Sequence, residues 1–304
     1  MKMAHCFNSP TKNSSTKTVA SRPLPSSMGP SLLQGRGWPW VFVLLFLAGI
    51  SIPSYACTSV IVSGKYTKDG KAVMFKHRDS DCQDVRVEYF SGEKYRMMCL
   101  VNADWRTNPL AKVPLGTREV WSGENETGFA IMNTATYDLK DDDVPADMMD
   151  GEGILMYRAL EICATLEDFE HFLDTLSRPM RVEANFGVID NKGGAAYYEV
   201  NNHSWVKFDV NREPLGYRVV TNFTTTGRVE DRKGVDRYIK AHKILASTYV
   251  PMEEWDHTFF IKNISCSGKP ILRDITSCAI VFEGNTMWAS LGKPDKVPCL
   301  PYKL

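Results

Sequence analysis

The chain has 304 residues, of which 43% are hydrophobic and 24% charged, as in an ordinary folded globular protein. Its formal net charge is zero, but the charges are unevenly distributed. Residues 1–56 carry five basic residues and no acidic one, so residues 57–304 carry 31 basic and 36 acidic residues. A mildly acidic chain without a basic cluster argues against a nucleic-acid partner.

The first 56 residues have the pattern of an export signal. Residues 1–37 are rich in Ser, Thr, Pro and Gly, which predicts an unstructured leader, and Met28 is an alternative start. The apolar stretch that follows, residues 38–52, is shorter than the ~20 residues that span a bilayer. This length favours the core of a signal peptide over an uncleaved membrane anchor.

The triplet Ser54-Tyr55-Ala56 has the small-x-small pattern of a signal-peptidase site, so we expect an exported protein that begins at Cys57. Its location would be periplasmic or extracellular. Cleavage would place a free α-amine beside the thiol of Cys57, and the two groups form a nucleophile and a base on one residue. Because an α-amine titrates at about 7.7–8.0, part of it is neutral at working pH and can accept the thiol proton.

Two alternatives concern the same cysteine. Cys57 could be an ordinary structural cysteine, or it could be lipidated in a lipoprotein or ligand-binding module. The lipidation signal usually has Leu where Ser54 stands, which favours plain cleavage.

Six further cysteines remain after the leader and Cys57 are set aside. They are Cys82, Cys99, Cys163, Cys266, Cys278 and Cys299. Their even number permits disulfides in an exported protein, and the last three of them are the best candidates. No CxxC pair and no paired histidines occur at ligand spacing, so we expect no metal site.

From Cys57 onward the pattern predicts a β-hairpin. The β-branched run at 57–63 and the segment 72–79 flank an Asp-Gly turn at 68–71. Pairing of the two strands would bring residues 78–81 back beside Cys57. There Arg78 would stabilise a thiolate and Asp81 would hold the amine, although the same two charges could form an ordinary surface ion pair. Strand alternation directs His77 to the opposite face.

The rest of the chain alternates between strand and helix patterns. Helices are predicted at 153–164, at 165–177 after a cap at Thr165, and at 234–248. The acidic run at 141–143 lacks the spaced ligands of a calcium loop and is interpreted as a solvated turn. Strands are predicted at 85–90, 95–101, from 128, 185–190, 195–200, 204–210, 217–222, 271–281 and 286–291. This order predicts two stacked sheets with outer helices in a single domain, residues 57–304.

The motif CTSVIV at 57–62, followed by HRDSD at 77–81, resembles the start of the cysteine-type N-terminal nucleophile (Ntn) hydrolases. That group includes choloylglycine hydrolase, penicillin V acylase, acid ceramidase and the isopenicillin N acyltransferase-like enzymes. The resemblance implies an α+β fold, a four-layer αββα sandwich of two mainly antiparallel sheets with helices outside.

The resemblance also implies roles for individual residues. Cys57 matches the nucleophile, and Arg78-x-x-Asp81 matches the pair that flanks it. In GENETGFAIMNTATYD, Asn133 falls where the family places an oxyanion or substrate contact. Asn222 ends VVTN, which resembles the strand whose asparagine donates to the oxyanion, although it could also be a turn residue or the start of a glycosylation sequon. Arg237 in Asp-Arg-Tyr resembles the last active-site arginine, although it could be a solvent-facing helix charge.

The implied activity is hydrolysis of linear amides other than peptide bonds, through an acyl-thioester, with acyl transfer to an amine as a further outcome. The expected partner is a small amide with an apolar acyl group, and the family requires no cofactor. No stable membrane span is expected after processing, and a homo-oligomer is left open. The gap between Cys57 and Arg78 is longer than in the bile-salt branch. The Thr-Lys-Asp-Gly-Lys hairpin also resembles the related cysteine dipeptidases, which are therefore an alternative.

Overall fold

The computed structural model describes residues 56–103, 119–139, 144, 145, 149, 151–247 and 255–304. The predicted leader, its apolar stretch and the acidic run at 141–143 lie outside the described residues, and of the cleavage triplet only Ala56 is described. Within the described ranges, no helix has both the length and the apolar character needed to cross a membrane.

The predicted hairpin lies inside a six-stranded antiparallel sheet. Cys57 pairs with Arg78 at one end of the hairpin, and Val62 pairs with Val73 at the other. At the connecting turn Gly70 has a φ of 73°, a conformation that glycine adopts without a steric penalty. The strand order is β10 (Tyr217–Val220), β1 (Cys57–Val62), β2 (Val73–Asp79), β11 (Thr276–Glu283), β12 (Thr286–Leu291) and β13 (Leu300–Tyr302).

The second sheet has seven strands, which are neighbours in chain order. They are β3 (Val85–Ser91), β4 (Arg96–Asn102), β5 (Ser122–Asn125), β6 (Ala130–Ala135), β7 (Ala184–Ile189), β8 (Ala195–Val200) and β9 (Trp205–Asp209). The sequence pattern did not predict β5 or β13. β5 reads Ser-Gly-Glu-Asn and has none of the β-branched or aromatic residues typical of strands.

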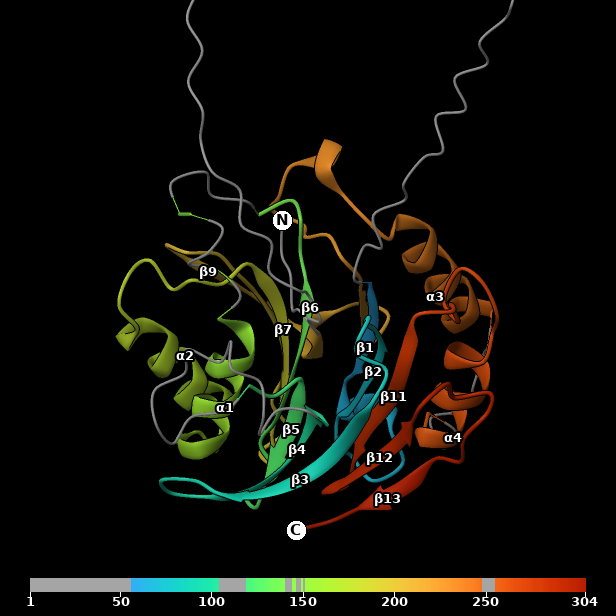
Figure 1. Ribbon diagram of the computed structural model, residues 1–304, viewed down its shortest axis with the longest axis horizontal. Coiled ribbons are helices and arrows are strands. Elements are labelled where there is room, and N and C mark those ends of the chain that lie inside the picture. The colour runs from blue at the N-terminus through green and yellow to red at the C-terminus, as the bar shows by residue number, and fades with distance from the viewer. Residues whose placement is uncertain (1–55, 104–118, 140–143, 146–148, 150, 248–254) are drawn as a thin grey trace, which may run out of the picture. The chain divides into compact units, whose positions relative to one another are not determined.

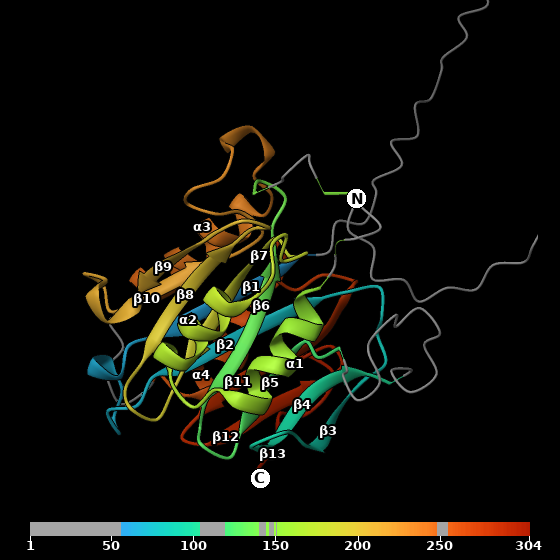
Figure 2. The same cartoon turned by 90° about the vertical axis from the view of Figure 1, so that its left-hand side faces the viewer.

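Helices cover the outer face of each sheet (Figures 1 and 2). α1 (Glu152–Ile162) and α2 (Leu166–Thr175) pack on the seven-stranded sheet. α3 (Val235–Ser247), α4 (His257–Phe259) and the π-helix η5 (Phe260–Ser265) pack on the six-stranded sheet. The predicted cap of α2 is confirmed, since Thr165 and Asp168 form a reciprocal capping box.

Three hydrophobic clusters fill the spaces between these layers of sheets and helices. One lies between α1, α2 and the seven-stranded sheet, one between the two sheets, and one between the six-stranded sheet and α3, α4 and η5. Strand alternation assigns each side chain to a layer: Ile61 and Met74 lie between the sheets, whereas Val60 and Phe75 lie under the helices. The predicted two-sheet sandwich with outer helices is therefore confirmed.

The disulfide that the cysteine count permits near the C-terminus is not present among the described residues. Cys266, Cys278 and Cys299 are all free thiols. Cys278 is fully buried on β11, between the sheets, and its burial raises the pKa of its thiol.

Candidate active site

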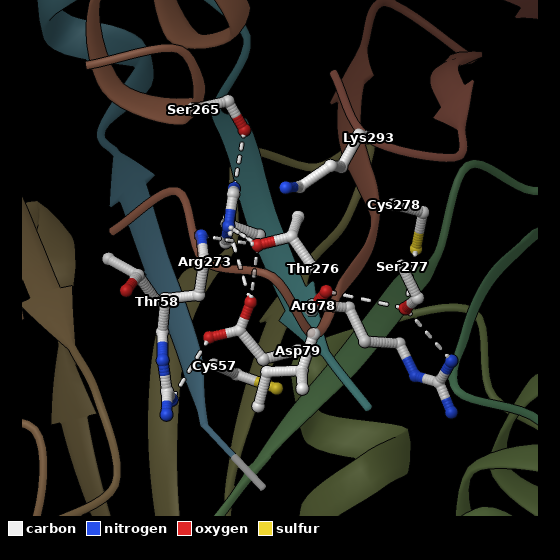
Figure 3. Close-up of polar contacts among 12 residues, drawn as sticks. Cys57, Thr58, Arg78, Asp79, Ser265, Arg273, Thr276, Ser277, Cys278 and Lys293 are labelled. Atoms are coloured by element: carbon white, nitrogen blue, oxygen red, sulfur yellow. Dashed lines mark hydrogen bonds and ion pairs between the residues drawn. The ribbon is translucent and has the colours of Figure 1, made fainter. Parts of the chain in front are cut away.

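Cys57 begins β1, directly opposite Arg78 on β2, and its side chain is half-buried. The alternation that places Ile61 between the sheets places Cys57, four residues earlier, on the same side. Arg78 and Met74 share the equivalent face of β2. The predicted neighbourhood of Cys57 and Arg78 is therefore present in the structure (Figure 3).

Asn222 contacts the backbone nitrogen of Cys57. Its side-chain oxygen Oδ1 accepts hydrogen bonds from Cys57 N at 2.9 Å and from the Arg237 guanidinium at 2.7 Å. Its Nδ2 donates to the carbonyl oxygen of Ala135 at 2.7 Å. The amide orientation is unambiguous, because a backbone N–H and a guanidinium can only donate. Asn222 is fully buried, so these contacts fix it rigidly.

Arg237 lies on the first turn of α3 and is buried, which excludes the solvent-facing alternative. Besides Asn222, its guanidinium donates to the carbonyl oxygen of Cys57 and to Oγ1 of Thr58, the latter at 3.3 Å. Burial lowers the pKa of Arg237 below its ordinary value, while Asp79 and Cys57 act in the opposite direction. One guanidinium therefore binds both Cys57 and Asn222.

Arg78 is held on the inter-sheet side by contacts that include a hydrogen bond to the carbonyl oxygen of Cys82 at 3.5 Å. Its guanidinium donates to Ser277 Oγ at 3.2 Å and to Asn102 Oδ1 at 3.1 Å, and it lies 5.1 Å from the centre of the Trp121 ring. Because Arg78 pairs with Cys57 on one side and with Cys278 on the other, it lies between two thiols.

Asp79 and Asp81 differ in burial at the end of β2. β2 ends at Asp79, and Asp81 lies past this end with an exposed side chain. Asp79 is buried, and its backbone nitrogen donates to the carbonyl oxygen of Ala56, the residue before Cys57. The hairpin register explains this: with Cys57 opposite Arg78, the next residue on β2 faces Ala56.

Asp79 belongs to a polar network on the helix side of the sheet that the sequence did not indicate. Its carboxylate accepts from Thr276 Oγ1 at 2.7 Å and lies 3.4 Å from Arg273 (Figure 3). His77 bonds Ser265 at 2.7 Å and Thr276 at 3.1 Å. The predicted orientation of His77, away from Cys57, is confirmed. The register of the hairpin could have indicated that Asp79 lies close to Cys57. No feature of the sequence indicated that Thr276 or Arg273 would join it.

Asn133 lies on β6 and is buried, and its Oδ1 accepts a hydrogen bond from Lys76 Nζ at 2.9 Å. Lys76 was not predicted as a functional residue. Its side chain lies between the sheets, and burial lowers its pKa from 10.5 to about 8, partly offset by the nearby Cys57.

Among the described residues no group of three or more His, Cys, Asp or Glu side chains is arranged to hold a metal ion. Cys57 is contacted by the amide of Asn222 and the guanidinium group of Arg237, and it pairs in register with Arg78. The ammonium group of Lys76 is close enough to Cys57 for an electrostatic effect and binds the amide of Asn133. Such a set can polarise a carbonyl group and stabilise negative charge.

Comparison with known proteins gives structural matches alone. No family model and no curated protein matches the chain. A solved structure of the Caenorhabditis elegans N-acylethanolamine-hydrolyzing acid amidase ortholog is 15% identical, with a TM-score of 0.54, over 74% of this chain and 92% of that one. Weaker similarity extends to a mutant conjugated bile acid hydrolase from Clostridium perfringens (13% identity, TM-score 0.48, 82% and 97% covered). Penicillin V acylase from Agrobacterium tumefaciens gives 15% identity and a TM-score of 0.46, with 77% and 82% covered.

The two antiparallel sheets, their outer helices and the first of these matches define the class: the chain has the αββα fold of the Ntn hydrolases. The fold expected from CTSVIV and HRDSD is thus confirmed. The particular reaction is a separate question, because a shared fold at this level of identity does not fix a function.

Proposed function

We propose that the chain is an exported hydrolase of linear amides whose nucleophile is Cys57 after removal of the residues before it. The observation that carries the proposal is the group of contacts at one end of β1. Asn222 and Arg237 bind the nitrogen and the carbonyl oxygen of Cys57, and Arg78 pairs with it in register. These contacts hold the backbone of Cys57 at its nitrogen and at its carbonyl oxygen, and so fix the atom from which the thiol side chain extends.

Cleavage of the bond between Ala56 and Cys57 would convert the backbone nitrogen of Cys57 into an α-amine. Asn222 Oδ1 already accepts a hydrogen bond from this nitrogen, so the new amine would form in a defined position. The amine would then have its lone pair beside its own thiol, which removes the need for a separate base.

In the first half of the reaction, the sulfur of Cys57 attacks the amide carbonyl carbon while the α-amine takes the thiol proton. The carbonyl oxygen becomes an oxyanion, for which the NH2 groups of Asn133 and Asn222 are the candidate donors. The C–N bond then breaks, the leaving amine takes the proton from the α-ammonium group, and an acyl-thioester remains on Cys57.

In the second half, water attacks the thioester and gives its proton to the α-amine. The C–S bond breaks, the sulfur regains a proton from the α-ammonium group, and a carboxylic acid leaves. If an amine replaces water, the same steps transfer the acyl group. No step needs a group beyond this chain and its two reactants.

The proposed substrate is a small linear amide with an apolar acyl group. The apolar preference comes from the sequence resemblance. The first structural match is described as an N-acylethanolamine-hydrolyzing amidase, which makes N-acylethanolamines a useful first probe. Dipeptides test the alternative of a cysteine dipeptidase.

The test starts with expression of the full chain and mass spectrometry of the exported product. We expect a mature protein that begins at Cys57 and carries no lipid. It should hydrolyse at least one of a series of N-acylethanolamines and N-acyl amino acids of graded acyl length faster than a dipeptide panel. A product that begins elsewhere, or a lipidated one, contradicts the mechanism.

Variants of two cysteines complete the test. Cys57→Ala should reduce hydrolysis by at least ~10⁴-fold, because removal of a nucleophile eliminates the covalent route. Cys266→Ala is the matched control, since Cys266 is a partly exposed free thiol at the end of η5. It should leave the rate unchanged. Equal rates for Cys57→Ala and the wild type would refute the proposal.

A further inference from the structure

Lys76 lies in the middle of β2, and only 1% of it is exposed to solvent. It faces the inter-sheet space, two residues before Arg78 and opposite Ser59 of β1. A buried ammonium group is costly unless hydrogen-bonding partners compensate for the lost water. A methionine or leucine would fill the same space without this cost, so the lysine requires an explanation.

The partners of Lys76 come from the opposite sheet. Its Nζ donates to the carbonyl oxygen of Trp121 at 2.5 Å and to Oδ1 of Asn133 at 2.9 Å. β5 pairs with β6 no further than Ser122 opposite Met132, so Trp121 and Asn133 both lie just past the end of this pairing. The ammonium group is therefore hydrogen-bonded at the place where the pairing of β5 with β6 ends.

These contacts determine how the Asn133 amide is oriented. An ammonium group can only donate hydrogen bonds, so the amide must present its oxygen to Lys76 and its NH2 group in another direction. Among the described residues, none accepts a hydrogen bond from that NH2 group. Asn133 is 7% exposed, so its amide is not entirely closed off from solvent.

Lys76 also lies in the electrostatic environment of the nucleophile. The titratable or charged groups that face it are Cys57 from β1, Arg78 from its own strand and Cys278 from β11. From the other sheet, Tyr197 of β8 reaches Ser59, the strand partner of Lys76. Burial is the largest influence and lowers the pKa of Lys76 to about 8, whereas Cys57 and Cys278 raise it. At neutral pH the group is a cation close to Cys57.

We propose that Lys76 is a positioning residue for amide hydrolysis, which fixes the NH2 group of Asn133 as a donor for the substrate carbonyl and supplies a positive charge beside Cys57. This inference rests on the proposed function of Cys57 as nucleophile. It assigns Lys76 an action through Asn133 and through its charge, without contact with the substrate.

The first test is the pH profile of kcat/KM for the processed wild-type enzyme on its best amide substrate. We expect an alkaline decline with a midpoint at about pH 8, as Lys76 loses its charge. Lys76→Arg keeps a positive charge at all working pH values and should lack this decline. Lys76→Met should be ~10²-fold slower at pH 7, as after loss of an oxyanion donor, and should also lack the decline.

Lys240→Met is the matched control. Lys240 also donates to backbone carbonyl oxygens, those of Ser267, Gly268 and Lys269, but it lies on α3 and outside the site. This variant should keep both the rate and the alkaline decline of the wild type. A double-mutant cycle between Lys76→Met and Asn133→Ala should be strongly non-additive, because the two changes remove the same donor. Full additivity would contradict an action through Asn133.

Alkylation of Cys57 by iodoacetamide separates this inference from the proposed function, since it needs no substrate. The wild type should be alkylated several-fold faster than Lys76→Met at pH 7, and the ratio of the two alkylation rates should approach one above pH 9.5. The role of Lys76 is refuted if this ratio is one at every pH and the wild-type profile of kcat/KM shows no alkaline decline. In that case an inactive Cys57→Ala variant would still support Cys57 as the nucleophile. If no amide is hydrolysed, the alkylation ratio still decides whether Lys76 acts on Cys57.

Discussion

The side-chain oxygen of Asn222 lies 2.9 Å from the backbone nitrogen of Cys57, although 165 positions separate the two residues in the chain. The contact exists because β10 pairs antiparallel with β1, with Ser59 opposite Val220, so the chain after β10 passes the first residue of β1. The nitrogen that would become the α-amine is therefore bound by the fold before any cleavage.

The contact offers Asn222 a second role, binding of the Cys57 nitrogen, besides the oxyanion donation that the family resemblance implies, and two substitutions distinguish the two roles. Asn222→Asp keeps the oxygen that accepts from Cys57 and Arg237 but loses the NH2 group. Asn222→Ala loses both. If binding of the Cys57 nitrogen dominates, the Ala variant should lose ~10²–10³ in kcat/KM and the Asp variant clearly less.

Steady-state kinetics at saturating and limiting substrate measure this difference. Asn191→Ala, at an exposed turn, serves as the control and should match the wild type. Equal losses in both Asn222 variants would instead support donation of the NH2 group to an oxyanion.

The second prediction concerns the two aspartates after Arg78. Asp79 is buried and bonded to Thr276 and Arg273, so Asp79→Asn should lower the free energy of unfolding by roughly 1–3 kcal/mol and reduce activity. Asp81 is exposed, so Asp81→Asn should change stability by less than about 0.5 kcal/mol and should affect activity less. Urea denaturation measures the free energy of unfolding of the Asp79→Asn and Asp81→Asn variants, and steady-state kinetics measure their activity. A larger loss of activity in Asp81→Asn would restore the role expected from the Arg-x-x-Asp motif.

The third prediction is a dependence of stability on pH caused by Lys76. Its pKa is about 8 in the folded chain and 10.5 when exposed, so between these values the unfolded state binds more protons. The contribution of Lys76 to the free energy of unfolding should therefore rise by about 3 kcal/mol from pH 8 to pH 10.5. Lys76→Met should lack this rise. The measurement is the difference in free energy of unfolding between the wild type and Lys76→Met, from urea denaturation across this pH range. A difference that stays constant with pH would contradict the prediction.

The fourth prediction concerns Glu124 on β5, which is buried and whose Oε2 has no hydrogen-bond partner among the described residues. Burial raises its pKa from 4.5 to about 8, so the folded state binds more protons between these values, and stability should fall as pH rises. Glu124→Gln removes the charge with little change in shape. It should stabilise the protein at pH 8.5 by on the order of 3–5 kcal/mol and much less at pH 4.5.

Glu126→Gln is the control for Glu124→Gln. It changes a neighbouring glutamate that forms an exposed ion pair with Arg96, and it should alter stability little at either pH. Equal stabilisation by Glu124→Gln at both pH values would indicate that the burial of a charge is not the cause.

The local sequence was sufficient for those elements and faces that depend on neighbouring residues. The hairpin from Cys57, the alternation that separates Arg78 from His77 and the cap at Thr165 were all predicted, because each depends on residues close in the chain. The polar segment β5 escaped prediction, since its strand state is imposed by its neighbours β4 and β6.

The sequence by itself determined a cysteine that opens a β-hairpin, the arginine paired with it and the two-sheet architecture, because these follow from short-range periodicity and turn chemistry. The tertiary structure alone decided that Asn222 and Arg237 bind Cys57, that Asp79 is buried where Asp81 is not, and that Lys76 reaches Asn133. Those contacts depend on strand order, register and the stacking of two sheets. Residues far apart in the chain meet only through these, and no local pattern encodes them.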